Sequence, residues 1–175
     1  MSNKYFTTPI YYVNDKPHIG HAYTSIAVDI LKRFYKCRGL NSYFLTGTDE
    51  HGQKVEKAAL EKNIDPQQFT DTVSENFRDL SSLLNLSNDD FIRTTEERHK
   101  KSVQNLWKVL LEKDEIYLSK YSGWYSVRDE AYFHESELID GKSPTGATVE
   151  WVEEPSYFFN LSKWQDKLLE FYSSN

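Results

Sequence analysis

A strand, a helix and a second strand follow one another at the start of the chain, and this order restricts the possible folds more than any other feature. Residues 4–10 are rich in aromatic and β-branched side chains and lead into a turn at residues 14–17. Residues 20–38 carry apolar side chains at helical spacing, and residues 41–46 form a second β-rich run. Two strands joined through a helix indicate a parallel βαβ unit, so we expect an α/β protein.

The middle of the chain predicts more helices and one short strand. Asp65 and Pro66 supply an N-cap and a first helical residue for a helix that continues to residue 84. A shorter helix is expected over residues 55–62, and a brief strand over residues 90–94. A further helix begins near residue 95, and its apolar side chains recur at helical spacing. We expect these side chains to be buried: Val103, Leu106, Trp107, Leu110 and Leu111.

The pattern changes at residue 116, where short aromatic runs separated by turn-forming residues replace the helices. We therefore expect residues 116–160 to form a small, mainly antiparallel β insertion. Residues 1–115 then make up the α/β domain, and residues 161–175 form a helix that returns towards it.

Composition restricts the class of protein and the compartment in which this fold is expected. Of the 175 residues, 38% are apolar, which is enough to form a hydrophobic core. Aromatic residues make up 15%, a larger share than disordered chains have. The single cysteine, Cys37, forms no internal disulfide, and the amino terminus has no signal-peptide pattern, so we expect a cytoplasmic protein. No apolar run is long enough to span a membrane, and the net charge of −6 gives no basic patch for nucleic acid.

Two histidines three residues apart, His18 and His21, lie between the first strand and the first helix. A helix start presents free N–H groups and a positive dipole, so phosphates bind there. Gly20, between the histidines, leaves room for a flat base or ribose. The tetrapeptide by itself is equally compatible with a surface turn whose histidines are solvated.

A second polar segment, residues 47–52, follows the second strand and contains Asp49 and Glu50. The carboxyl ends of neighbouring parallel strands meet at one edge of a sheet, where ligands bind. We therefore expect one crevice that combines a phosphate-binding helix start with acidic residues able to hold an ammonium group. The alternative is a solvated acidic turn.

Three motifs in this order resemble the methionyl-tRNA synthetase family of class I aminoacyl-tRNA synthetases. They are Pro-Ile-Tyr-Tyr-Val-Asn at residues 9–14, His-Ile-Gly-His at residues 18–21 and Gly-Thr-Asp-Glu-His-Gly at residues 47–52. The resemblance covers essentially the whole chain. It implies the first half of a Rossmann-type catalytic domain, interrupted by a connective insertion.

The resemblance implies roles for six residues. His18 and His21 match catalytic histidines that contact the ATP phosphates, and Gly20 matches the glycine on which adenine packs. Ile10, Tyr12 and Asp49 match positions that bind methionine, with Asp49 holding its amino group. The implied reaction is activation of methionine with ATP and Mg²⁺, followed by transfer of the methionyl group to tRNA(Met).

The insertion departs from many members of the family, which carry zinc knuckles there. The corresponding segments, residues 126–129 and 143–146, hold no cysteine, and His134 is the one imidazole in the insertion. Zinc needs about four thiolate or imidazole ligands. We therefore expect an insertion without zinc, and no metal-binding residues in the chain.

The family's KMSKS loop and anticodon-binding domain are not found in these 175 residues. The resemblance thus implies an amino-terminal part of a longer enzyme that is inactive by itself. Another class I synthetase or nucleotidyltransferase, or a non-catalytic binding module of the same fold, stays open at this point, as does the oligomeric state.

Overall fold

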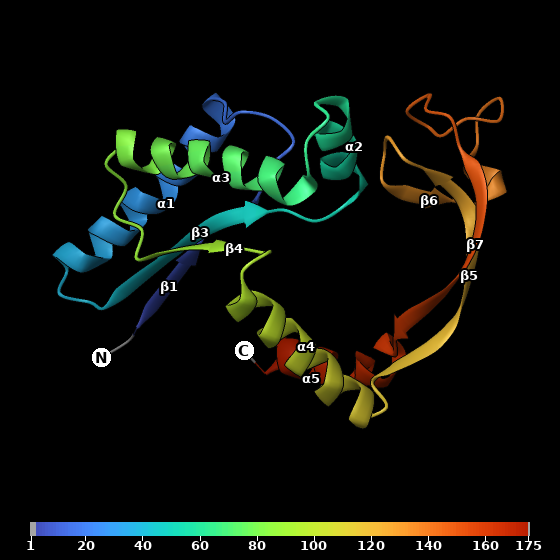
Figure 1. The fold of residues 1–175 in the computed structure, drawn as a ribbon. Helices are drawn as coiled ribbons and strands as arrows, with labels where there is room; N and C mark the ends of the chain where they lie inside the picture. The colour runs from blue at the N-terminus through green and yellow to red at the C-terminus, as the bar shows by residue number, and fades with distance from the viewer. Residues whose placement is uncertain (1–2, 175) are drawn as a thin grey trace. The chain divides into compact units, whose positions relative to one another are not determined.

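The computed structural model describes residues 3–174, which divide into two compact units between Ser102 and Val103. Each unit has its own sheet (Figure 1). None of the helices in the described residues is both long enough and apolar enough to cross a membrane. The predicted domain boundaries after residues 115 and 160 stay a prediction.

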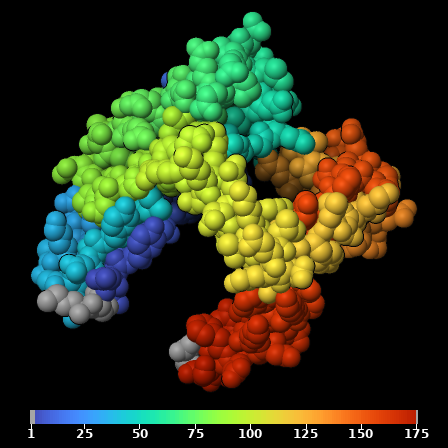
Figure 2. Space-filling view, turned by 60° about the horizontal axis from the view of Figure 1, so that its bottom comes forward, coloured from blue at the N-terminus to red at the C-terminus, as the bar shows by residue number. Residues whose placement is uncertain are grey.

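The first unit contains a parallel sheet centred on β3, as the strand–helix–strand order predicts. Strand β1 pairs with the first half of β3, β4 pairs further along it, and β2 pairs with its last two residues, all in parallel. These strands are β1 (Lys4–Thr7), β2 (Tyr11–Tyr12), β3 (Ser42–Asp49) and β4 (Asp90–Arg93). In the space-filling view the blue atoms of β1 lie beside the cyan atoms of β3 (Figure 2).

Helices α1 (Ile19–Cys37) and α3 (Pro66–Leu83) lie along the same face of this sheet, with α2 (Gln53–Glu61) packed beside α3 (Figure 1). The core between these helices and the strands is built from fully or nearly fully buried side chains: Tyr11, Val13, Val55, Ala59, Phe69, Val73, Phe77 and Phe91. The opposite face of the sheet is open, because the stacked rings of Tyr5 and Tyr43 are 63% and 42% exposed.

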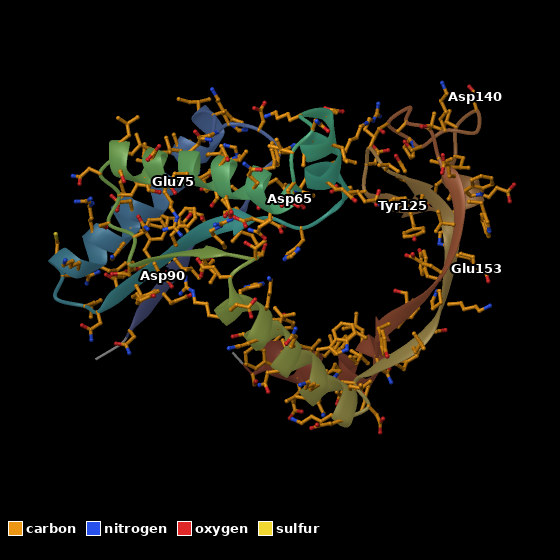
Figure 3. The ribbon with its side chains drawn as sticks, in the orientation of Figure 1. Asp65, Glu75, Asp90, Tyr125, Asp140 and Glu153 are labelled. Atoms are coloured by element: carbon orange, nitrogen blue, oxygen red, sulfur yellow. The ribbon has the colours of Figure 1, made fainter. Side chains whose placement is uncertain are left out.

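The start of α3 confirms the predicted N-cap. The Asp65 side chain accepts hydrogen bonds from the backbone N–H groups of Gln67 (2.9 Å) and Gln68 (3.2 Å), and Pro66 occupies the first turn. Asp65 lies at the amino end of the helix in Figure 3. Two N–H groups that the helix cannot satisfy internally are thereby paired.

The second strand is longer than predicted. Strand β3 continues through Asp49, so Gly47, Thr48 and Asp49 belong to the sheet and the prediction of a loop from residue 47 was wrong. A Cβ at Gly47 would lie 2.0 Å from the carbonyl oxygen of Ile92. The glycine therefore permits β3 and β4 to approach closely, and in this context it extends a strand instead of ending one.

The apolar stripes of two helices are more exposed than expected. On α1, Ile30 is 61% exposed and Phe34 is 53% exposed, whereas the polar Asp29 and Lys32 are buried. In α4 (Glu97–Glu112) the prediction of a buried apolar face was wrong, because its Val103, Leu106, Trp107 and Leu111 side chains are 44–59% exposed. Helical periodicity identifies an apolar face, but it does not supply the surface that would cover it.

The second unit contains the predicted antiparallel β module. Strand β5 (Ile116–Ser126) lies between β6 (Ala131–Phe133) and β7 (Glu150–Phe159), and both pairings are antiparallel. A 3₁₀ turn at Leu161–Trp164 leads into α5 (Gln165–Ser173). Helix α5 has no buried residue, and its Leu168, Leu169 and Phe171 are exposed.

The Asp129 carboxylate holds two turns of this module together. It accepts hydrogen bonds from the hydroxyls of Ser126 (3.0 Å), Ser143 (2.6 Å) and Thr145 (2.8 Å). Ser126 and Ser143 are almost fully buried. The hydrogen bonds from Ser143, Thr145 and Ser126 lower the pKa of Asp129 to about 2, so the carboxylate is ionised at neutral pH.

Candidate functional site

A cavity of about 570 Å³ lies at the carboxyl end of the first strand and the start of α1. It brings together four of the six predicted site residues, Ile10, Tyr12, His18 and His21. The remaining lining residues are Pro9, Tyr11, Asn14, Asp15 and Lys16. The first two motifs therefore meet around a single cavity, whereas Gly20, Asp49 and Glu50 do not line it, so the predicted crevice that includes the acidic residues is not formed by these side chains.

The two histidines form the cap of α1. The Nδ1 atom of His18 accepts a hydrogen bond from the backbone N–H of Gly20 (3.0 Å), and Nδ1 of His21 accepts one from the backbone N–H of His18 (3.0 Å). A neutral imidazole that accepts at Nδ1 carries its proton at Nε2. The cap thus makes Nε2 of both rings a hydrogen-bond donor.

The ring of His21 is held from two further sides. Tyr11 and Phe77 contact it edge-on, with ring centroids 4.7 Å and 5.1 Å away, and the ring of His18 lies 3.9 Å away. Burial, together with the neighbouring His18, lowers the pKa of His21 and favours its neutral form. Phe77 could not be assigned to this site from the sequence, because an apolar residue at helical spacing looks like any other core residue.

Gly20 is required by the cap itself. A Cβ at this position would lie 2.9 Å from Cε1 of His18 and 3.0 Å from its Nδ1. A side chain here would therefore force the ring of His18 to shift from its capping position. This steric reason is independent of the adenine contact that the resemblance implies.

Asp49 lies beside Tyr12 across two paired strands. The two residues are register partners of β3 and β2, so their side chains lie on the same face of the sheet. Within residues 3–174 the Asp49 carboxylate makes no hydrogen bond or ion pair, and it is partly exposed. This carboxylate is available to an external cation.

The neighbouring Glu50, unlike Asp49, is hydrogen-bonded and ion-paired within the protein, so the two adjacent carboxylates have different roles. Its side chain is buried and accepts hydrogen bonds from Arg93 at both oxygens (2.7 Å and 2.9 Å) and from Thr48 (2.7 Å). Burial opposes its ionisation, but the hydrogen bonds from Arg93, Thr95 and Thr48 outweigh burial and lower the pKa of Glu50. Of the two, Asp49 alone is left to face a ligand.

The described residues contain no group of three or more His, Cys, Asp or Glu side chains arranged to hold a metal ion. In the segments compared above with zinc knuckles, residues 126–129 and 143–146, Asp129 is surrounded by hydroxyl groups. One carboxylate and neutral hydroxyls are a poor ligand set for zinc, which prefers thiolate and imidazole.

Sequence comparisons place this chain in a known family. Residues 4–149 match the family described as tRNA synthetases class I (M). The methionine–tRNA ligase of Rickettsia conorii is 68% identical over 100% of this chain and 35% of its own length. That of Listeria monocytogenes is 49% identical over 98% of this chain and 27% of its own length. The chain thus spans about a third of the length of these relatives.

A solved structure shows the same similarity in three dimensions. The structure described as Mycobacterium tuberculosis methionyl-tRNA synthetase in complex with methionyl-adenylate has 46% sequence identity and a TM-score of 0.90. The match covers 100% of this chain and 35% of the Mycobacterium chain. The α/β fold with its parallel sheet, predicted from the sequence, is therefore that of class I synthetases.

Proposed function

The chain belongs to the class I tRNA synthetases of the methionine type, and we propose that it forms the half of such an enzyme that binds ATP and methionine. The reaction is attack by a carboxylate oxygen of methionine on the α-phosphorus of ATP. The bond to the leaving pyrophosphate breaks, and methionyl-adenylate forms. The methionyl group then passes to a hydroxyl of the terminal ribose of tRNA(Met).

The observation that carries this proposal is the paired histidine cap at the cavity. His18 and His21 each accept a backbone hydrogen bond at Nδ1, which leaves two Nε2–H groups as donors. Donors fixed before the reaction stabilise the charge that builds up on a phosphoryl group in the transition state. The positive end of the α1 dipole attracts the same anion, and Gly20 permits close approach of adenine.

The methionine site combines one free carboxylate with apolar surface. We assign Asp49 to the ammonium group of methionine, because a carboxylate without a protein partner forms a charge-assisted hydrogen bond with an ammonium. Tyr12, the register partner of Asp49, and Ile10 line the cavity, and their exposed fractions of 54% and 40% leave surface for a ligand. Mg²⁺ accompanies the ATP phosphates, and we place the protein in the cytoplasm.

Pyrophosphate exchange tests the proposed function. The full-length protein should exchange labelled pyrophosphate into ATP when methionine is added, and not when leucine or isoleucine replaces it. The 175 residues by themselves should give no appreciable exchange, because the second set of phosphate donors expected from the family, the KMSKS loop, is not among them. Exchange with another amino acid would indicate a different synthetase, and binding without exchange would indicate a non-catalytic module.

We also propose that the insertion is stabilised by Asp129 in place of zinc. Elemental analysis should find no stoichiometric zinc, chelators should leave the melting temperature unchanged, and Asp129→Asn should lower it. Because the folded pKa of about 2 lies below the ordinary 3.8, this stabilisation is present above about pH 4 and is lost as the pH falls towards 2.

Asp140→Asn is the matched control for this substitution. Asp140 lies in an exposed turn of the same unit (Figure 3), and its φ of 51° is one that asparagine tolerates. It should leave the melting temperature and its acid dependence unchanged. One tightly bound zinc per chain, or equal melting temperatures for Asp129→Asn and the unmodified protein, would contradict the proposal.

A further inference from the structure

A buried hydrogen-bond network lies directly behind Asp49. Its centre is the Glu50 carboxylate, whose side chain has 0% of its surface exposed. The guanidinium of Arg93 binds both oxygens of Glu50 and also contacts Asp71 on α3 at 2.5 Å. The hydroxyl of Thr95 donates to the same carboxylate. The network therefore connects the ends of β3 and β4 to a helix.

The backbone around Asp49 is fixed by the same group of residues. The backbone N–H of Glu50 donates to Oγ1 of Thr94 (2.8 Å), and the backbone N–H of Thr94 donates to the carbonyl oxygen of Thr48 (3.2 Å). The Nε2 atom of His51 lies 3.2 Å from the carbonyl oxygen of Thr94, within hydrogen-bond distance. Asp49 thus lies between residues that are all bonded to the segment after β4.

Successive side chains of a strand point to opposite faces of the sheet, and this alternation sets the direction of the Asp49 side chain. Thr48 and Glu50 point to the buried side, where Thr48 also bonds Ser74 of α3 (3.0 Å), so Asp49 between them points to the other face. A slip or tilt at Glu50 would move the Asp49 carboxylate relative to Tyr12. The charge of Glu50 is matched by Arg93, so Glu50 does not compete with Asp49 for a cation.

We propose that Glu50 and Arg93 are positioning residues that hold Asp49 in place for the ammonium group of the amino-acid substrate. This inference rests on the proposed function, since it assumes that Asp49 binds the substrate amine. Neither Glu50 nor Arg93 contacts the substrate. Their effect is therefore expected in the methionine constant and not in the ATP constant, because the proposed ATP-binding histidines lie on another element, at the start of α1.

Glu50→Gln in the full-length protein tests the proposal. Glutamine keeps the shape and one acceptor oxygen, but its amide N–H₂ faces the N–H groups of Arg93 and ends the two-fold hydrogen bond. The KM for methionine in pyrophosphate exchange should rise about tenfold or more, as expected for a misplaced binding group, with the KM for ATP changed much less. Thr95→Val, which removes one hydroxyl donor, should act in the same direction but more weakly and keep the protein folded.

Asp29→Asn is the matched control. Asp29 is also a buried carboxylate that accepts several hydrogen bonds, from the N–H and Oγ of Ser87 (both 2.6 Å) and from Arg33 (2.6 Å). Ser87 precedes β4, so these bonds lie at the end of the sheet away from Asp49. Asp29→Asn should lower the melting temperature and leave the methionine KM unchanged.

The outcomes separate this inference from the function on which it rests. If the unmodified protein gives no methionine-dependent exchange, the proposed function fails. If it does, and Glu50→Gln and Thr95→Val both keep the methionine KM of the unmodified protein, the positioning role is wrong. An equal rise in KM in Asp29→Asn would assign the effect to general loss of stability and would also overturn the proposal.

Discussion

Replacing His21 with alanine in the full-length protein is expected to lower the rate of methionyl-adenylate formation by about 10²–10³ at saturating substrates, the cost of losing one preorganised donor to a transition state. The affinity for ATP should change much less, because the donor acts mainly on charge that develops during the reaction. Single-turnover measurement of adenylate formation, with equilibrium titration of ATP, gives the two quantities separately.

Two further substitutions distinguish the donor role of His21 from its role in the helix cap. The Nδ1 atom caps α1 by accepting from the N–H of His18, whereas Nε2 is the proposed donor to phosphate. Asparagine can replace the acceptor but not reach the position of Nε2, and glutamine can place an amide N–H₂ near that position. His21→Asn should therefore be about as slow as His21→Ala, and His21→Gln should recover part of the rate.

Two results with these variants would contradict the mechanism. Full recovery by His21→Asn would mean that capping of the helix is what His21 contributes. A loss confined to ATP affinity, with an unaltered rate at saturation, would make His21 a binding residue only. Because Phe77 and Tyr11 hold the ring from two sides, a small side chain at position 21 leaves space that the core does not fill.

The fold was predictable wherever local chemistry and periodicity agree. The strand–helix–strand order gives the parallel sheet, and Asp65 with Pro66 marks the start of α3 because both residues act on the nearest turn. The course of β3 through Gly47 was not predictable in this way. It depends on the close approach of Ile92 from a strand far away in sequence, and a glycine by itself suggests a turn.

Burial of helix faces was the second failure, for a related reason. The apolar side chains of α4 are at the predicted spacing, but Leu106 and Trp107 are 59% and 44% exposed. On α1 the buried residues are polar: Lys32 forms an ion pair with Asp89 (2.6 Å) and Asp29 binds Ser87. Ion pairs between distant segments leave no periodic trace in a sequence.

Four of the predicted site residues lie around one cavity, but the sequence did not separate Asp49 from Glu50. The sequence indicates two adjacent carboxylates, and the structure separates them through a partner forty-three residues from Glu50. One signal was available beforehand: Arg93 is a charged residue at the end of a predicted strand, the same edge of a parallel sheet at which Asp49 lies. A cation at that edge needs an anion nearby, and Glu50 provides it.

Removing the Asp49 carboxylate is expected to weaken methionine binding by about 1.5–3 kcal/mol, the usual worth of a hydrogen bond to a charged group, or roughly 10–150-fold in the dissociation constant. Asp49→Ala leaves the ammonium group of methionine without its proposed partner. It should not disturb the fold strongly, because within residues 3–174 this carboxylate bonds no other group. Equilibrium titration of methionine into the full-length variant measures the effect directly.

Glu75→Ala controls for the change in net charge. Glu75 is exposed on α3 (Figure 3) and its removal alters the charge of the protein by the same amount. It should leave the methionine dissociation constant unchanged, whereas Asp49→Ala should raise it while ATP affinity and the melting temperature stay close to those of the unmodified protein.

Methionine analogues test the same contact from the ligand side. Methioninol keeps the ammonium group and should lose affinity in Asp49→Ala as methionine does. An analogue without the amino group should bind the variant and the unmodified protein alike. Equal methionine constants for Asp49→Ala and Glu75→Ala would remove Asp49 from the site, and with it the substrate group that Glu50 and Arg93 are proposed to serve.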